Sequence, residues 1–311
     1  MKSVQLKEYG DTSNIFINEI EIPSPNSDQV LIEVYASSIN PSDIKLMEGV
    51  MKPASHTVPP FTLGGDLAGI IKQTNTKDTS FNIGDKVYGQ ANVLGGNSGA
   101  IAEFAVTKLN QIAKMPSNLD FNQAASLPLV GVSALQAIIE NINLKTEQKI
   151  FILGGAGGIG SVAIQLAKRI GAYVATTSSN QDINFVKGLG ADQVIDYKSH
   201  DYLSLLKDYD AVFDTVGGED FNKSLTILKI GGIAVSMNTQ ADQELANDLG
   251  ITIISQFTKL STERLNNLTK FVESGAVIPK VDKVFPMEEV ADAIEAKENG
   301  RVKGKIVIQI K

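Results

Sequence analysis

Residues 150–180, IFILGGAGGIGSVAIQLAKRIGAYVATTSSN, place a loop made almost entirely of glycine between two apolar runs. Gly155, Gly157 and Gly160 spell G-x-G-x-x-G. The amphipathic segment after them predicts a helix, and the second apolar run predicts a strand. A strand, this loop, a helix and a second strand in that order form the context in which the motif indicates a dinucleotide site. A glycine-rich turn without a ligand is the alternative interpretation.

Each glycine of this motif has its own physical role. The first permits the tight turn, the second lets the backbone approach a pyrophosphate, and the third lets the helix pack close to the strand. The free N–H groups and partial positive charge at the start of the helix then attract phosphates. The G-K-[ST] of a nucleoside triphosphate loop is missing, so ATP or GTP is not expected. The predicted contacts to the cofactor are Gly155, Ala156, Gly157, Gly158, Ile159 and Gly160.

Apolar runs and helical patterns alternate from residue 149 onward. The apolar runs lie near 150–153, 172–177, 192–195, 210–215, 232–237 and 250–256. The helical patterns between them lie near 158–170, 181–188, 201–207, 219–228 and 241–248. This rhythm predicts an α/β fold of the Rossmann type, a doubly wound parallel sheet with helices on both faces. We predict that residues 118–258 form this dinucleotide-binding domain.

The remaining segments predict a second domain that is rich in short strands. Runs such as DQVLIEVYASSIN, DLAGIIKQT and GDKVYG are bounded by Gly, Asn or Pro. Near the C-terminus, TERLNNLTKFVESGAV and MEEVADAIEAKENG have helical periodicity, and VKGKIVI alternates as a strand does. That last strand has no partner in the βα series, so we expect it to pair with the N-terminal strands. Residues 1–117 and 259–311 are therefore predicted to form the substrate domain.

Composition excludes several classes of site. The 311 residues contain no cysteine, which excludes disulfides, thiolate zinc sites, iron–sulfur sites and a cysteine nucleophile. A net charge of −7 opposes binding to nucleic acid or anionic lipid. No apolar run approaches the roughly 18 residues of a membrane span. The opening MKSVQLKEYG has no apolar stretch of the signal-peptide kind, so we expect a cytoplasmic protein.

The end of the second apolar run bears on the choice of dinucleotide. An NAD site usually carries Asp or Glu about 20 residues after the glycines, where it accepts from the ribose 2′-OH. Here Ser178 and Ser179 occupy that place, and Asp182 reads better as a first-turn residue of the next helix. Because hydroxyls can donate to a 2′-phosphate, we predict NADPH in preference to NADH. No Arg or Lys lies between Gly171 and Val186, so the phosphate needs further partners from distant parts of the chain.

The chain as a whole resembles the zinc-independent, quinone oxidoreductase-like branch of the medium-chain dehydrogenase/reductase superfamily. The motifs that carry the resemblance follow in the family's order: SSINPSDIK, GGDLAG, GDKVYG, GGAGGIGSVAIQLAK, LGADQVIDY, DTVGG and VKGKIVI. The resemblance implies a Rossmann domain joined to a GroES-like, β-barrel-type catalytic domain. It also implies hydride transfer from NADPH and a homodimer paired through sheet edges.

The resemblance implies further site residues. Tyr197 matches a tyrosine beside the adenosine phosphate, whereas Gln181 stands where many NADPH-using relatives carry Lys. Four residues match segments near adenine, ribose and nicotinamide: Val216, Gly217, Ser236 and Phe257. Gly304 and Lys305 belong to a motif near the cleft.

Departures from the zinc-dependent relatives argue against a metal. Those relatives carry Cys where Asn40 stands and a His-Glu pair where Gly65 and Asp66 stand. The two histidines, His56 and His200, form no local ligand pair and are interpreted as ordinary loop residues. We therefore predict no zinc.

Three residues of SSINPSDIK are candidates for the chemistry. Asn40 is the first candidate for a polar group beside nicotinamide or substrate, although Asn-Pro is also a common turn signal. Asp43 is expected mainly to fix the loop, because an ordinary carboxyl with a pKa near 3.9 is ionised at neutral pH. Lys45 could donate a proton or attract the cofactor phosphate, with a plain exposed lysine as the alternative.

These features together predict an NADPH-dependent reductase of quinones or related electrophilic carbonyls. A conjugated acceptor delocalises the incoming charge, so hydrogen bonds to its oxygen can replace a Lewis acid. Reduction of the C=C bond of α,β-unsaturated ketones or aldehydes is a second hypothesis. A non-catalytic sensor or scaffold that binds NADPH is a third, because a fold does not guarantee chemistry.

Overall fold

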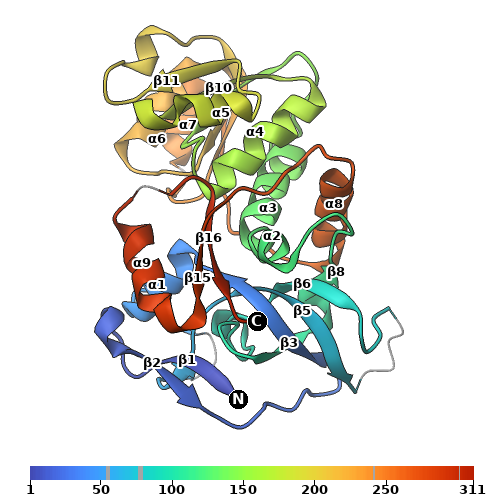
Figure 1. The fold of residues 1–311 in the computed structure, drawn as a ribbon. Helices are drawn as coiled ribbons and strands as arrows, with labels where there is room; N and C mark the ends of the chain where they lie inside the picture. The colour runs from blue at the N-terminus through green and yellow to red at the C-terminus, as the bar shows by residue number, and fades with distance from the viewer. Residues whose placement is uncertain (54–56, 76–79, 241, 301) are drawn as a thin grey trace. The chain divides into compact units, whose positions relative to one another are not determined.

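The computed structural model describes residues 1–53, 57–75, 80–240, 242–300 and 302–311 of the chain (Figure 1). Contacts divide the chain into two compact units. Unit 1 comprises Met1–Leu129, Leu260–Glu273 and Pro279–Lys311, and unit 2 comprises Val130–Lys259 and Ser274–Ile278. Each unit is described by itself below. In the part of the chain described, no helix is long and apolar enough to cross a membrane.

Unit 2 contains a parallel sheet of six strands in the order β11-β10-β9-β12-β13-β14. The strands are β9 (Lys149–Leu153), β10 (Tyr173–Ser178), β11 (Gln193–Asp196), β12 (Tyr209–Asp214), β13 (Leu228–Ser236) and β14 (Thr252–Ser255). The chain builds outward from β9 to β11 and then returns to β12 on the other side of β9. This reversal between β9 and β12 is the topological switch point of a Rossmann fold, where dinucleotides bind beyond the carboxyl ends of the strands.

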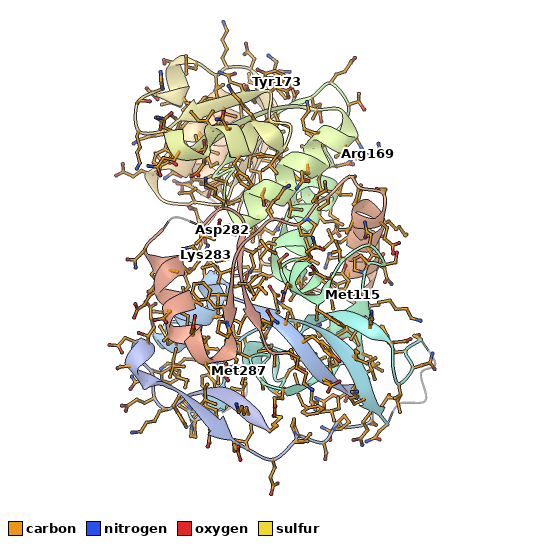
Figure 2. The ribbon with its side chains drawn as sticks, viewed as in Figure 1. Met115, Arg169, Tyr173, Asp282, Lys283 and Met287 are labelled. Carbon is orange, nitrogen blue, oxygen red and sulfur yellow. The ribbon has the colours of Figure 1, made fainter. Side chains whose placement is uncertain are left out.

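Helices precede the first strand of this sheet and connect the later ones. They are α3 (Pro128–Leu135), which continues as a π-helix over Gln136–Asn141, α4 (Gly158–Ile170), α5 (Ile183–Gly188), α6 (Glu219–Ser224) and α7 (Gln243–Leu249). Helix α4 ends at Gly171, whose φ of +94° suits glycine, and Lys168 and Arg169 lie in its last turn, where cations favour the helix dipole. Figure 2 labels Arg169 and Tyr173, which are both exposed, and Tyr173 pairs with Lys149 at the amino end of β9.

The central strand of unit 2 lies in its hydrophobic core, which explains why its sequence is an apolar run. Ile150, Phe151 and Ile152 of β9 are completely buried, as expected for a central parallel strand covered on both faces. The Phe151 ring packs 5.0 Å from the Tyr202 ring, centroid to centroid. Tyr202 belongs to a single 3₁₀ turn, Tyr202–Ser204, so the helix predicted near 201–207 is wrong. The turn keeps Tyr202 in the core, and the Asp201 carboxylate caps it by accepting from the Leu203 N–H.

Unit 1 contains a mainly antiparallel sheet of seven strands in the order β15-β16-β3-β5-β6-β8, with β7 also pairing β3, and a smaller sheet in the order β2-β1-β4. The strands are β1 (Lys2–Leu6), β2 (Ile15–Glu19), β3 (Gln29–Ser38), β4 (Phe61–Thr62), β5 (Asp66–Thr74), β6 (Lys86–Gln90), β7 (Phe104–Lys108), β8 (Ile112–Lys114), β15 (Val281–Pro286) and β16 (Lys305–Gln309). The helices are α1 (Pro41–Met47), α2 (Phe121–Ala125), α8 (Thr262–Glu273) and α9 (Val290–Glu298).

The last strand of the chain joins this N-terminal sheet, as the sequence predicts. β16 pairs antiparallel with β3, with Val307 opposite Ser38. The pairing brings Lys305, at the start of β16, next to the chain that leaves β3 for α1. It thereby positions the buried polar cluster described below.

Candidate functional site

The glycine loop of unit 2 lies between β9 and α4, and its three motif glycines meet different surroundings. A Cβ on Gly155 would lie 2.3 Å from the Thr176 hydroxyl oxygen, and a Cβ on Gly160 would lie 2.2 Å from the Gly154 carbonyl oxygen. At Gly157 the nearest atom would be 3.4 Å away. Gly155 and Gly160 are therefore required by close packing within the protein, whereas a Cβ on Gly157 would make only an ordinary van der Waals contact.

The first turn of α4 presents N–H groups without protein acceptors. Gly157 caps the helix and supplies no side-chain hydrogen bond. Within the described residues, no acceptor is found for the amides of Gly158, Ile159 and Gly160, which are the orphan donors of a helix N-terminus. The loop itself is fixed by β10, because Thr177 accepts from the amides of Gly154 and Gly155. These residues fit the pyrophosphate of a dinucleotide: the donors are oriented, and Gly157 leaves room for a close approach.

The ends of β10 and β11 bring together the residues predicted for the adenosine side. Ser178 lies opposite Asp196, and the Tyr197 amide donates to the Ser178 carbonyl at 3.3 Å. Ser178 is buried and its hydroxyl donates to the Ser179 carbonyl, whereas the Tyr197 side chain is 56% exposed. The Lys198 ammonium lies 5.9 Å from the centroid of the Tyr197 ring. A cation therefore lies beside this edge, although the sequence around Ser178 offers none.

Asp182 interacts with Ser179 at this edge, a contact that the sequence analysis did not predict. Its carboxylate accepts a hydrogen bond of 2.7 Å from the Ser179 hydroxyl, because the 3₁₀ turn Asn180–Asp182 folds it back. Ser179 is thus held by an acid rather than presented as a free donor. Gln181 is exposed.

The predicted residues near β12 and β13 are organised by Asp214. This completely buried carboxylate accepts from the Val216 and Gly217 amides, both at 2.9 Å, and from the Ser236 hydroxyl at 2.6 Å. Ser236 is buried and acts within this network, while Val216 is 55% exposed. Phe257 is 80% exposed. Asp214 is the residue that holds this part of the site together, and the sequence reasoning missed it, although it begins the quoted DTVGG.

Unit 1 contains a separate cluster of buried polar side chains around Asp66. This carboxylate is fully buried at the start of β5 and accepts four hydrogen bonds. The donors are the Ser38 hydroxyl at 3.0 Å, the Asn40 amide at 2.8 Å, the Gln90 amide at 2.8 Å and the Leu129 backbone N–H at 3.1 Å. Both carboxylate oxygens are therefore in use, which is what a buried charge requires.

Lys305 brings the compensating cation into this cluster. Its ammonium is buried, lies 3.7 Å from an Asp66 carboxylate oxygen, and donates to the Ile39 carbonyl at 2.8 Å and to the Asn40 side-chain oxygen. Asn40 is therefore held at both ends of its amide, by Asp66 and by Lys305. The Asn40 side chain also hydrogen-bonds the Asp43 carboxyl, so its amide is committed to this cluster. Burial lowers the pKa of Lys305 to about 8, against the opposing effect of the two nearby carboxylates.

Asp43 and Lys45 differ in their surroundings although both lie on α1. The Asp43 carboxylate is buried and accepts from the Asn40 backbone N–H at 2.8 Å, so it caps its own helix as expected. Burial raises the pKa of this carboxyl to about 7, and repulsion by Asp66 adds to the effect. The sequence-based reason for discounting Asp43 as an acid, an ordinary pKa, therefore does not apply. Lys45 is exposed.

Two family models match the chain: an alcohol dehydrogenase GroES-like domain over residues 26–117 and a zinc-binding dehydrogenase over residues 189–308. The 2-methylene-furan-3-one reductase of Solanum lycopersicum is 33% identical, over 99% of this chain and 79% of its own length. The chain belongs to the quinone oxidoreductase-like branch of the medium-chain dehydrogenase/reductase superfamily. It is an oxidoreductase with a Rossmann unit and a GroES-like unit.

Two further relatives agree with this family. The chloroplastic NADPH-dependent alkenal/one oxidoreductase of Arabidopsis thaliana is also 33% identical, over 99% of this chain and 79% of its own length. The solved structure of the quinone oxidoreductase from Coxiella burnetii is 33% identical, with a TM-score of 0.92 over 100% of this chain and 99% of that chain. The family is thus shown along the whole chain.

The residues of this chain do not fit the zinc that one family description names. Asn40 and Gly65 offer neither thiolate nor imidazole, and Asp66 is saturated by four donors. Among the described residues, no group of three or more His, Asp or Glu side chains could hold a metal ion. His200 is exposed and contacts the Ser199 hydroxyl at 2.8 Å, and His56 lies outside the described residues.

Proposed function

We propose that this protein uses NADPH to reduce quinones or related electrophilic carbonyls by hydride transfer, without zinc. The observation that carries the proposal is the turn between β9 and α4, where the first helix amides have no acceptor among the described residues and Gly157 is not closely packed. Bound NADPH supplies the hydride, and the protein supplies binding, orientation and polarity. The relatives named for quinone, alkenal/one and furanone substrates support a conjugated acceptor.

The cofactor contacts follow the ends of the unit 2 strands. We propose that Gly155 to Gly160 hold the pyrophosphate and that Ser178, Ser179 and Tyr197 line the adenosine phosphate. Lys198, next to Tyr197, supplies the cation that a 2′-phosphate needs. Val216, Gly217, Ser236 and Phe257 are proposed to border the rest of the cofactor. On the acceptor side we propose Asn40, which also borders nicotinamide, together with Asp43 and Lys45.

Reduction of a C=C bond in α,β-unsaturated ketones or aldehydes is the second candidate. Two of the named relatives, the furanone reductase and the alkenal/one oxidoreductase, favour it. The same hydride transfer to the β-carbon, followed by a proton, would give a saturated ketone. Product identity separates the two reactions, because a quinone yields a hydroquinone.

The test is steady-state oxidation of NADPH and NADH with a panel of quinones and enones, followed by identification of the products. We expect turnover with NADPH and at least one conjugated acceptor. Tight binding of NADPH without turnover on any acceptor would overturn the enzymatic proposal.

Cofactor choice is tested with Ser178→Asp. A carboxylate placed beside the 2′-phosphate should raise the Kd for NADPH about tenfold or more and leave the Kd for NADH nearly unchanged. Thr146→Asp is the matched control. Thr146 is exposed and precedes β9, so it lies near the amino ends of the strands, away from Ser178. Equal changes in both variants, or tighter NADH binding by the wild type, would contradict the assignment.

We also propose a homodimer and a cytoplasmic location. β14 is one of the two edge strands of the six-stranded sheet, and we propose that it pairs with an edge strand of a second copy. Light scattering during size-exclusion chromatography measures the mass, for which twice 33.3 kDa is expected. Cell fractionation tests the location, which differs from that named for the chloroplastic relative.

A further inference from the structure

The buried cluster of unit 1 contains two carboxyl groups and one ammonium. Asp66 at the start of β5 and Lys305 at the start of β16 lie 3.7 Å apart and neutralise each other. Asp43 of α1 is the third group, and it is buried as they are. Its ionisation would add an uncompensated negative charge to this site, which burial disfavours. The cluster therefore favours the protonated, neutral form of the Asp43 carboxyl beside the Asp66–Lys305 ion pair.

The charged groups around Asp43 come from three other elements. Asp66 repels its charge and Lys305 attracts it. Lys297 of α9 faces Lys305, and its own pKa is lowered by burial. Lys45, on the same helix as Asp43, points to solvent. Burial is the dominant influence on Asp43 and raises its pKa to about 7, so a protonated fraction persists at neutral pH.

Gly65 borders one side of the Asp43 carboxyl. A Cβ on Gly65 would stand 3.6 Å from Asp43 Oδ1 and 3.8 Å from the Gln90 amide nitrogen, with nothing nearer than 3.3 Å. The other carboxylate oxygen, Oδ2, accepts from the Asn40 backbone N–H. Oδ1 is thus the oxygen that faces Gly65, and the Gln90 amide borders the same position.

We propose that Asp43 delivers the proton that completes the reduction, and that Asp66 and Lys305 are positioning residues that determine how firmly Asp43 holds it. The inference rests on the proposed function. Hydride transfer places two electrons and a negative charge on the acceptor. The O–H bond of Asp43 then breaks, its proton forms the new O–H or C–H bond of the product, and the Asp43 carboxylate recovers a proton from water.

The neighbours of Asp43 make opposite predictions for two variants. Asp66→Asn removes the repelling charge and leaves Lys305 to pair with Asp43, so Asp43 should lose its proton at lower pH. Lys305→Met removes the attracting charge, so Asp43 should hold its proton to higher pH. A merely structural role of the cluster would lower activity in both variants without moving the pH dependence in opposite directions.

The experiment is the pH profile of kcat/KM for a non-ionising quinone between pH 6 and 9.5, with solvent and substrate hydrogen isotope effects. For the wild type we expect a tenfold fall per pH unit above about 7. Asp43→Asn can still accept from the Asn40 N–H, and it should show a flat profile, about 10²-fold below the wild type at pH 6. The fall should begin at lower pH in Asp66→Asn and at higher pH in Lys305→Met. Glu48→Gln removes an exposed carboxylate just after α1 and should behave as the wild type.

Circular dichroism and the Kd for NADPH establish that each variant is folded. The inference fails if Asp43→Asn keeps the wild-type fall, if the other two variants shift in the same direction, or if the wild-type profile is flat. A flat wild-type profile would refute the inference by itself, even if a variant does not fold. Failure of the wild type to oxidise NADPH with any acceptor would instead refute the proposed function.

Discussion

Gly160→Ala should push helix α4 away from the strand that precedes it. The added Cβ would lie 2.2 Å from the Gly154 carbonyl oxygen and 2.9 Å from Gly155 Cα, and both neighbours are backbone. Ordinary contact begins near 3.4 Å, so the helix start must move by about 1 Å. Because both partners are backbone, no side-chain rotation can relieve the overlap.

The magnitude follows from the kind of strain. Overpacking of this size costs about 1–3 kcal/mol in the free energy of unfolding. The same displacement moves the first-turn amides relative to a bound pyrophosphate, and an error of about 1 Å in such a site can cost on the order of 10²-fold in rate. Gly188→Ala is the matched control: it lies in α5 of the same unit, and its Cβ would meet nothing within 4 Å. There we expect a gain of about 0.5–1 kcal/mol from reduced backbone freedom in the unfolded chain.

Urea unfolding, followed by circular dichroism, measures both changes, and fluorescence titration gives the Kd for NADPH. We expect Gly160→Ala to unfold at lower urea and to bind NADPH at least tenfold more weakly, while Gly188→Ala retains wild-type binding. A Gly160→Ala variant as stable as the wild type would refute the reasoning that Gly160 is fixed by helix-to-loop contact.

Two further predictions concern unit 1. The Asp43 carboxyl has a pKa of about 7 when folded and near 3.9 when unfolded, so the folded state binds more protons between these values and its stability falls as pH rises through them. In Asp43→Asn this decline should be absent. Urea midpoints of the wild type and the variant, measured from pH 4 to 8, test this. The same dependence of the midpoint on pH in both proteins would contradict the expectation. Tyr88→Phe should lower the free energy of unfolding by about 1–2 kcal/mol, because the buried Tyr88 hydroxyl donates to the Leu265 carbonyl at 2.8 Å. The exposed Tyr173→Phe should change it by less than about 0.5 kcal/mol, and equal effects in the two variants would argue against this account.

The parallel sheet was predictable because each of its strands contains an apolar run. Ile150 to Ile152 face helices on both sides, so burial alone reveals the strand. The segment near 201–207 shows the limit of the same reasoning. It was predicted to be a helix, but Leu203 and Leu205 are exposed, while Tyr202 and Leu206 are the side chains buried in the core. Which side chain of a short segment is buried depends on tertiary packing, which periodicity does not contain.

The glycine loop could be predicted for a related reason, since its residues are consecutive and their roles are local. The adenosine edge could be predicted only in part. The pairing of β10 with β11 places Asp196 opposite Ser178, with Tyr197 and Lys198 next along the chain, a register that the separate segments do not specify. Asp182 was interpreted as a first-turn residue, and its bond to Ser179 became visible only when the turn was folded.

The buried cluster was beyond prediction because its members are far apart in the chain. Lys305 lies 265 residues from Asn40, and in VKGKIVI it looks like any lysine of an alternating strand. Pairing of β16 with β3 turns it inward. A buried ion pair adds little net stability over well-packed apolar residues, and a third ionisable group adds a further desolvation cost. Stability therefore gives no reason for Asp43 to accompany Asp66 and Lys305 in this core. The proposed role of Asp43 as proton donor gives such a reason. An enzyme that adds hydride to a conjugated carbonyl must also supply a proton, and Asp66 and Lys305 set how firmly Asp43 holds it.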